Sequence, residues 1–448
     1  MPISPARVAA FEILLRIDRE DSYASELLHA ARYARLSSVD HGLATELVMG
    51  VLRWRSILDS HIASASSQQL SRLDLEVLTA LRIGCYQLMF LDRVPRHAAV
   101  NESVELVKRA RKRSAAAFAN AVLRKLAKVT IQPPDIGVAE RPTELAAASA
   151  HPAWLVDRWI SAYGFERTRE LCEYDRQTPV TALRVPSSEI ERELASEGIT
   201  LEPGSLLATS RRVISGDVTK TKGFRAGQVT IQDEGSQLVG LLVGQGNRIL
   251  DGCAAPGGKT RIMAQQNPGA TVVAAELHPH RARLMRDLVR EKNVCVIVSD
   301  IRKLPFVADF DRVLIDAPCS GTGTLAHNPE IKWRIEKEKQ KDAHLSKLQT
   351  LQIDILKSAM RHVAPRGRIV YSTCSLEPEE NEQVIDKAAE GESIFRVINC
   401  RDELQRLAAE RLLIWPDLDS LISGPYLRTI PGVHPCDGFF AAILERTI

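Results

Sequence analysis

The stretch Ile249-Leu-Asp-Gly-Cys-Ala-Ala-Pro-Gly-Gly-Lys-Thr260 decides the fold of its half of the chain. It combines a short apolar run, a glycine-rich turn and the polar start of a helix. Similar apolar runs, separated by helical patterns, occur at 271–276, 294–299, 312–315, 368–372 and 439–444. Buried parallel strands alternate with helices in this way, so residues 231–448 are predicted to form a doubly wound α/β sheet.

Three cofactor classes could use the glycine-rich turn. A phosphate-binding P-loop requires G-x4-G-K-[ST], but its first glycine would fall on Cys253, and Ala254 occupies the second glycine of a dinucleotide fingerprint. S-adenosylmethionine has no phosphate, and a compact turn lets the backbone approach its amino-acid end. We therefore expect a methyl donor of this kind to contact Cys253, Ala254, Ala255, Pro256, Gly257, Gly258 and Lys259.

Two acidic residues follow the next two predicted strands. Glu276 could accept hydrogen bonds from ribose hydroxyls, and Asp300 from an adenine amino group. Each could instead cap a helix or lie in solvent, but their places at the ends of successive strands favour the cofactor. None of the eight cysteines forms a CxxC pair, so we expect no metal site.

Two cysteines lie in segments that follow apolar runs, Asp316-Ala-Pro-Cys-Ser-Gly-Thr-Gly323 and Tyr371-Ser-Thr-Cys-Ser375. The carboxyl ends of parallel strands share one edge of a sheet, where ligands bind. Cys319 and Cys374 are therefore predicted to meet there beside Asp316, which suggests an enzyme that makes and breaks a carbon–sulfur bond. The alternative for either cysteine is a buried small apolar side chain.

The amino-terminal part has a different pattern. Residues 1–130 show helical spacing of apolar side chains, residues 131–142 are a proline-bearing linker, and residues 143–230 combine helices with a small α+β region, which we expect to extend a substrate channel. One basic cluster could bind phosphates or could simply be a solvated helix face. It consists of Lys108, Arg109, Arg111, Lys112 and Arg113.

Composition excludes several classes of protein. The 448 residues carry a net charge of only +3, and no apolar stretch is long enough to span a membrane. Glu12 and Arg16 interrupt the first apolar run, so no signal peptide is expected. These features predict a monomeric protein of the reducing cytoplasm, with its thiols free.

Several motifs together resemble the RNA 5-methylcytosine methyltransferases. They are the glycine-rich turn, the two cysteine segments, Gln232-Asp-Glu-Gly-Ser-Gln237, Pro329-Glu-Ile-Lys-Trp333, Pro378-Glu-Glu-Asn381 and Asp437-Gly-Phe-Phe440. In addition, Arg93-Val-Pro-Arg-His-Ala-Ala-Val-Asn-Glu-Ser-Val104 and Phe118-Ala-Asn-Ala-Val-Leu-Arg124 resemble the NusB-type helical RNA-binding fold. The combination is similar to the RsmB (Sun/Fmu) group, which implies methylation of one cytosine in free or partly assembled 16S ribosomal RNA.

The resemblance also implies a role for each site residue. Cys374 would attack the cytosine, Cys319 would assist product release, Asp316 would bind the edge of the base and contact the cofactor, and Lys259 would orient Asp316 or the base. Three alternatives remain open at this point: a DNA enzyme with Cys319 as nucleophile, against which the Thr373-Cys374 pair argues, a tRNA methyltransferase, and an RNA-binding assembly factor whose methyltransferase domain is inert.

Overall fold

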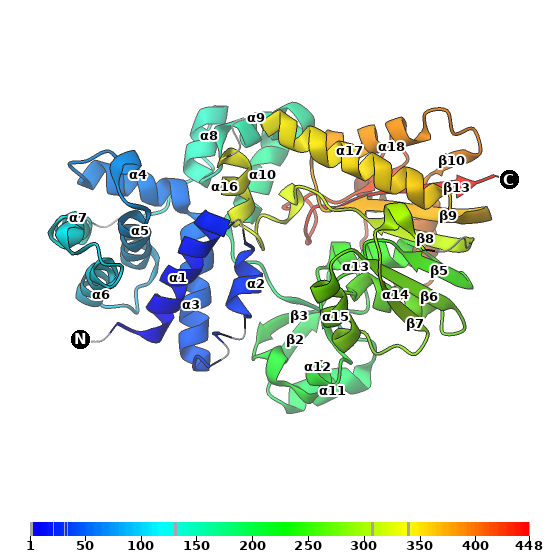
Figure 1. The fold of residues 1–448 in the computed structure, drawn as a ribbon, viewed down its shortest axis with the longest axis horizontal. Helices are drawn as coiled ribbons and strands as arrows, with labels where there is room; N and C mark the ends of the chain where they lie inside the picture. The colour runs from blue at the N-terminus through cyan, green and yellow to red at the C-terminus, as the bar shows by residue number, and fades with distance from the viewer. Residues whose placement is uncertain are drawn as a thin grey trace. The chain divides into compact units, whose positions relative to one another are not determined.

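The computed structural model describes residues 3–20, 22–30, 32–33, 35–129, 132–305, 309–337 and 341–447. The chain forms two compact units, of which the first contains Met1–Thr178 and Leu325–Lys337 and the second contains Pro179–Thr324 and Glu338–Ile448 (Figure 1). The predicted boundary at residues 130 and 131 lies outside the described residues. The two units are defined by contacts in space, whereas the four predicted segments are stretches of sequence. The bounds of those four segments therefore stay a prediction.

The first unit is built of helices. Most of its amino-terminal helices put small and branched apolar side chains on one face, and those faces form a common core that includes Phe11, Leu47 and Leu81. The helices are α1 (Pro5–Glu20), α2 (Ala24–Leu28), α3 (Ser38–Arg53), α4 (Arg55–Ala65), α5 (Leu75–Phe90), α6 (Arg96–Arg109), α7 (Ala116–Leu126), α8 (Pro142–Ser149), α9 (Ala153–Tyr163), α10 (Phe165–Arg176) and α16 (Glu330–Lys337). Pro95 lies in the break between α5 and α6.

The second unit contains a large sheet in the strand order β11-β12-β13-β9-β8-β5-β6-β7, with β10 pairing β13. The strands from β9 to β7 are parallel, and β13 is antiparallel to β9. The six predicted strands are all present, and the doubly wound fold is confirmed. The strands are β5 (Arg248–Asp251), β6 (Thr271–Glu276), β7 (Val294–Val298), β8 (Phe310–Asp316), β9 (Val363–Thr373), β10 (Phe395–Ile398), β11 (Ile422–Ser423), β12 (Tyr426–Arg428) and β13 (Phe440–Arg446).

Helices cover the large sheet because the apolar strands must be buried on both faces. Among them, α14 packs on β6, α15 packs on β6 and β7, and α17 packs on β8 and β9. In Figure 1, α17 is the long yellow helix beside β9. The helices are α13 (Glu234–Leu242), α14 (Gly258–Gln266), α15 (Pro279–Leu288), α17 (Lys341–Met360), α18 (Glu382–Ala389) and α19 (Cys400–Ala409).

A smaller sheet precedes the large one in the second unit, with the order β2-β3-β1-β4 and antiparallel pairing throughout. Leu183, Leu194 and Val229 form part of its own core. This is the predicted small α+β region. Its elements are β1 (Ala182–Arg184), α11 (Ser188–Ser196), β2 (Thr200–Pro203), β3 (Ser210–Ser215), α12 (Lys222–Arg225) and β4 (Thr230–Ile231). Within the described ranges, no helix is long and apolar enough to cross a membrane.

Candidate active site

The carboxyl ends of β8 and β9 bring the two cysteine segments together. Asp316, the last residue of β8, is the register partner of Ser372 in β9. Beyond this pair, the Sγ atoms of Cys319 and Cys374 lie 3.3 Å apart, and both side chains are half-buried free thiols. The hydrogen bond to Cys374, together with burial, raises the pKa of Cys319. Cys319 is therefore held as a neutral thiol next to Cys374.

Asp316 is fixed on both of its carboxylate oxygens. Lys259 donates from Nζ to Oδ2 over 2.7 Å, and the Ser372 hydroxyl donates to Oδ1 over 2.9 Å. The Lys259 ammonium also lies 5.2 Å from the ring centroid of Phe439, which adds a cation–π contact. A carboxylate held in this way has a defined direction, which is a requirement for recognising the edge of a base.

The glycine-rich turn joins the end of β5 to the first turn of α14. Gly257 has a φ of 107°, a left-handed conformation that favours glycine. Asp251, at the end of β5, is buried and accepts a hydrogen bond of 2.6 Å from the Thr260 hydroxyl on Oδ2. Its other oxygen, Oδ1, has no protein partner among the residues described. Burial raises the pKa of Asp251 to about 7.

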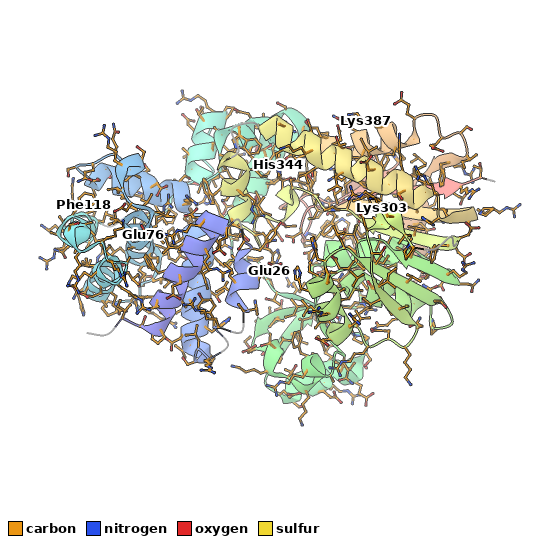
Figure 2. All side chains as sticks on the ribbon, viewed as in Figure 1. Glu26, Glu76, Phe118, Lys303, His344 and Lys387 are labelled. Carbon is orange, nitrogen blue, oxygen red and sulfur yellow. The ribbon has the colours of Figure 1, made fainter. Side chains whose placement is uncertain are left out.

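Glu276 and Asp300 lie at the ends of β6 and β7, where the sequence places them. Glu276 is buried and accepts from the backbone N–H of His278 over 2.8 Å. Asp300 caps the 3-10 turn Ile301–Lys303, whose last residue is labelled in Figure 2, and pairs with Arg302 over 2.7 Å. The Arg302 guanidinium lowers the pKa of Asp300. Both acids thus already have local partners. Asp300 also has the capping role that the sequence analysis gives as the alternative to cofactor binding.

A cavity of about 240 Å³ opens beside the glycine-rich turn. One wall is formed by Cys253–Lys259 with Asp251 and Asp316, and the opposite wall by residues of α12, β4 and α15. Neither the two cysteine thiols nor Glu276 and Asp300 line this cavity. Apart from Gln232, which belongs to the motif Gln232–Gln237, the opposite wall was not predicted, because nothing in its sequence marks it. It consists of Phe224, Gly227, Val229, Thr230, Ile231, Gln232 and Leu288.

A buried clamp behind the cysteines was also missed. Glu380, which is fully buried, accepts from the backbone N–H of Ser320 over 2.9 Å and from the hydroxyls of Ser320 and Ser375. The Gly323 N–H donates to the carbonyl of Cys374 over 2.9 Å. Glu380 belongs to the motif Pro378-Glu-Glu-Asn381, which was the available signal. The clamp ties the segment after Cys319 to the segment after Cys374.

The predicted basic cluster is largely ion-paired. Lys108 contacts Glu105 over 2.6 Å, Arg109 contacts Glu12 over 3.5 Å, and Lys112 contacts Asp74 over 3.1 Å. Only Arg111 and Arg113 lack an acidic partner in the described part of the chain. This arrangement is the one expected of a solvated helix face.

The motif Pro329-Glu-Ile-Lys-Trp333 belongs to the first unit. Lys332 is fully buried there and donates from Nζ to the carbonyls of Arg53 and Ala150, each over 3.0 Å. Trp333 donates from Nε1 to the carbonyl of Leu52 over 2.6 Å. In the residues that the structure describes, no group of three or more His, Cys, Asp or Glu side chains could hold a metal ion.

Comparison with known proteins gives three matches to family models. Residues 239–445 match the model described as 16S rRNA methyltransferase RsmB/F, residues 4–128 match the NusB family, and residues 151–210 match the ferredoxin-like domain of RsmF/B-like methyltransferases. The NusB match confirms the predicted amino-terminal fold, and the ferredoxin-like match overlaps the small sheet.

Whole-length relatives show the same arrangement. The chain is 33% identical, over 86% of its own length and 88% of the relative, to a probable ribosomal RNA small subunit methyltransferase B of Bacillus subtilis. It is 32% identical, over 92% of its own length and 91% of the relative, to ribosomal RNA small subunit methyltransferase B of Klebsiella pneumoniae. The crystal structure of PH0851 shares the fold over 100% of both chains, with a TM-score of 0.77 and 22% identity.

Proposed function

The chain belongs to the 16S rRNA methyltransferase RsmB/F family, and from this premise we propose that it transfers a methyl group from S-adenosylmethionine to carbon 5 of one cytosine in 16S rRNA. The observation that carries the proposal is the pair of thiols 3.3 Å apart beside a fixed carboxylate at one sheet edge. Carbon 5 of cytosine is a poor nucleophile, so the ring must first be activated by covalent addition.

In the proposed reaction, the Cys374 thiolate adds to carbon 6 of the cytosine and forms a sulfur–carbon bond. Electron density moves to carbon 5, which takes the methyl group while S-adenosylhomocysteine leaves with the electron pair of the broken bond. Transfer of the carbon 5 proton to a water molecule restores the ring double bond, and the electron pair of the broken sulfur–carbon bond leaves with the Cys374 thiolate. Cys319 assists this release, since its sulfur is in contact with that of Cys374.

Asp316 binds the edge of the base and stabilises a proton on ring nitrogen 3 in the adduct. Lys259 keeps this carboxylate oriented through the contact at Oδ2, and Ser372 does the same at Oδ1. The target base must leave any stack before Cys374 can reach its face, and this costs least in unpaired RNA. We therefore infer free or partly assembled 16S rRNA as the substrate of a monomeric, cytoplasmic enzyme.

The glycine-rich turn fits the methyl donor. Asp251 is among the residues that line the cavity, and its Oδ1 is buried without a described hydrogen-bond partner, which suits an acceptor for the donor's ammonium group. Gly257 is left-handed, and a Cβ there would meet the Val289 side chain at 2.4 Å, so the glycine lets the turn pack closely against Val289 and hold its backbone at the cavity. Glu276 and Asp300 do not line this cavity and keep the local partners described above, so their contacts with the ribose and the adenine stay a prediction. The donor supplies the electrophilic methyl group, and the protein supplies its orientation.

Bisulfite sequencing of total RNA from a deletion strain tests the proposal most directly. The expected result is the loss of 5-methylcytosine at one position of 16S rRNA, restored by the intact gene and not by the Cys374→Ala variant. Loss of the modification from a tRNA would indicate the tRNA alternative. An unchanged modification pattern in all RNA would support the inert assembly factor and contradict the proposal.

A further inference from the structure

Helix α15 and the turn after it carry exposed cations without acidic partners. Arg283 and Arg286 are three residues apart and therefore share a face of the helix. Arg290 follows the helix, and its guanidinium donates to the backbone carbonyl of Arg225 in α12 over 3.2 Å. None of these three cations forms an ion pair with any residue that the structure describes. They differ in this respect from the ion-paired cluster at residues 108–113.

The contact between Arg290 and Arg225 joins this row of cations to α12. There, the side chains of Lys222 and Arg225 are also exposed and without an acidic partner among the described residues. Asp287 is exposed within the same stretch, while Glu291 is already paired with Arg261 over 3.0 Å. The net charge of these exposed side chains on α12, α15 and the turn after α15 is therefore positive, even when Asp287 and Glu291 are counted.

Apolar side chains lie along the same helix. Leu284 is 51% exposed and Leu288 is 42% exposed, and their spacing of four residues puts them on one face. Leu288 also lines the 240 Å³ cavity, together with Phe224 and the 45% exposed Ile231. An apolar wall thus continues from the surface of α15 into the cavity that contains Asp316 and Lys259. Such exposed apolar area beside cations is typical of a binding surface.

We propose that α12 and α15 form a binding surface for single-stranded RNA beside the cavity that Asp316 and Lys259 line. The cations of Arg283, Arg286 and Arg290 contact phosphates, and the side chains of Leu284 and Leu288 contact the faces of unstacked bases. A duplex hides those faces, so the apolar part of the surface favours a single strand. The inference rests on the proposed function, since it names where that enzyme holds its substrate.

The first test compares Arg283→Gln/Arg286→Gln with a matched control, Arg361→Gln/Arg366→Gln. The control removes two exposed arginines at the amino-terminal end of β9, at the opposite end of that strand from Thr373. For the α15 variant we expect a higher KM for RNA, an unchanged kcat at saturating RNA, and an unchanged thermal shift with S-adenosylmethionine. The slope of log affinity against log salt should fall by about 0.7 for each lost phosphate contact.

The second test uses Leu284→Ser in a fluorescence binding assay with an unpaired oligonucleotide and its duplex. We expect weaker binding of the single strand, with an unchanged salt slope and little effect on the duplex. The inference would be overturned if the Arg283→Gln/Arg286→Gln variant had the same KM and the same salt slope as the wild type. It would also be overturned if the wild-type protein bound the single strand and the duplex with equal affinity. Because binding is read separately from methylation, an enzyme that binds through α15 yet methylates no RNA would contradict the proposed function alone.

Discussion

At the scale of single residues, the two cysteines divide the chemistry between them. We expect Cys374→Ala to abolish methylation and the covalent adduct with RNA that contains 5-fluorocytosine. Cys319→Ala should keep the adduct and release product slowly, since the addition step is intact. A denaturing gel resolves the adduct from free protein. The assignment is reversed if Cys319→Ala loses the adduct while Cys374→Ala forms it.

The same pair predicts sensitivity to thiol oxidants. The Sγ atoms are 3.3 Å apart, so a disulfide with a bond of about 2.05 Å requires little movement. A diazene oxidant such as diamide would accept two electrons and two protons from the thiols. We expect activity to fall to background and to return with dithiothreitol, with mass spectrometry showing a 319–374 cross-link. The prediction is contradicted if the enzyme keeps its activity after diamide has oxidised all of its accessible thiols.

At the scale of elements, helix α16 contains a fully buried lysine whose pKa is shifted by burial. Burial lowers the pKa of Lys332 to about 7. The unfolded chain binds a proton at this residue up to its ordinary pKa, so the folded protein binds fewer protons from about pH 7 upward. The stability of the wild type relative to Lys332→Met should therefore rise with pH, by about 1.4 kcal/mol per pH unit.

Urea unfolding at pH 7, 8 and 9 measures this difference for the first unit. The comparison with Lys332→Met cancels the titration of groups that do not interact with Lys332, while His151 and Cys172, whose pKa values Lys332 lowers, are the exceptions. Asp175, whose charge opposes the shift, remains in both proteins. A difference in unfolding free energy that stays flat over this range would show that Lys332 keeps its proton in the folded state.

The strands and the site loops could be predicted because their signals are local. β5, β8 and β9 are apolar runs that end in polar loops, and the parallel arrangement alone brings Asp316 and Cys374 to one edge. The motif Pro378–Asn381 marks Glu380, but neither the partners of Glu380 in the clamp nor the cavity wall at Phe224 could be predicted. They depend on segments that meet only after folding, and a buried glutamate looks like a surface one in sequence. The ion pairs of Arg109 with Glu12 and of Lys112 with Asp74 were hidden for the same reason, whereas Lys108 and Glu105 are neighbours on one helix.

At the scale of the whole molecule, a ligand should stabilise one unit and leave the other unchanged. The cavity is lined only by residues of the second unit. Saturating S-adenosylmethionine should add about 2.7 kcal/mol to its unfolding free energy at a concentration of 100 times Kd. Scanning calorimetry should show one transition that moves upward and one that does not. If S-adenosylmethionine raised the midpoint temperature of neither transition, an inert methyltransferase domain would be favoured.

The place of α16 in the first unit has a consequence for synthesis on the ribosome. The helices up to residue 178 emerge first, but Lys332 and Trp333 complete their packing from a segment that is translated much later. At 5–20 residues per second, the nascent helical unit waits roughly 10–30 s for its last piece. During that interval the carbonyls of Arg53 and Ala150 lack the hydrogen bonds that Lys332 donates in the folded unit. We therefore expect chaperones to bind the incomplete domain.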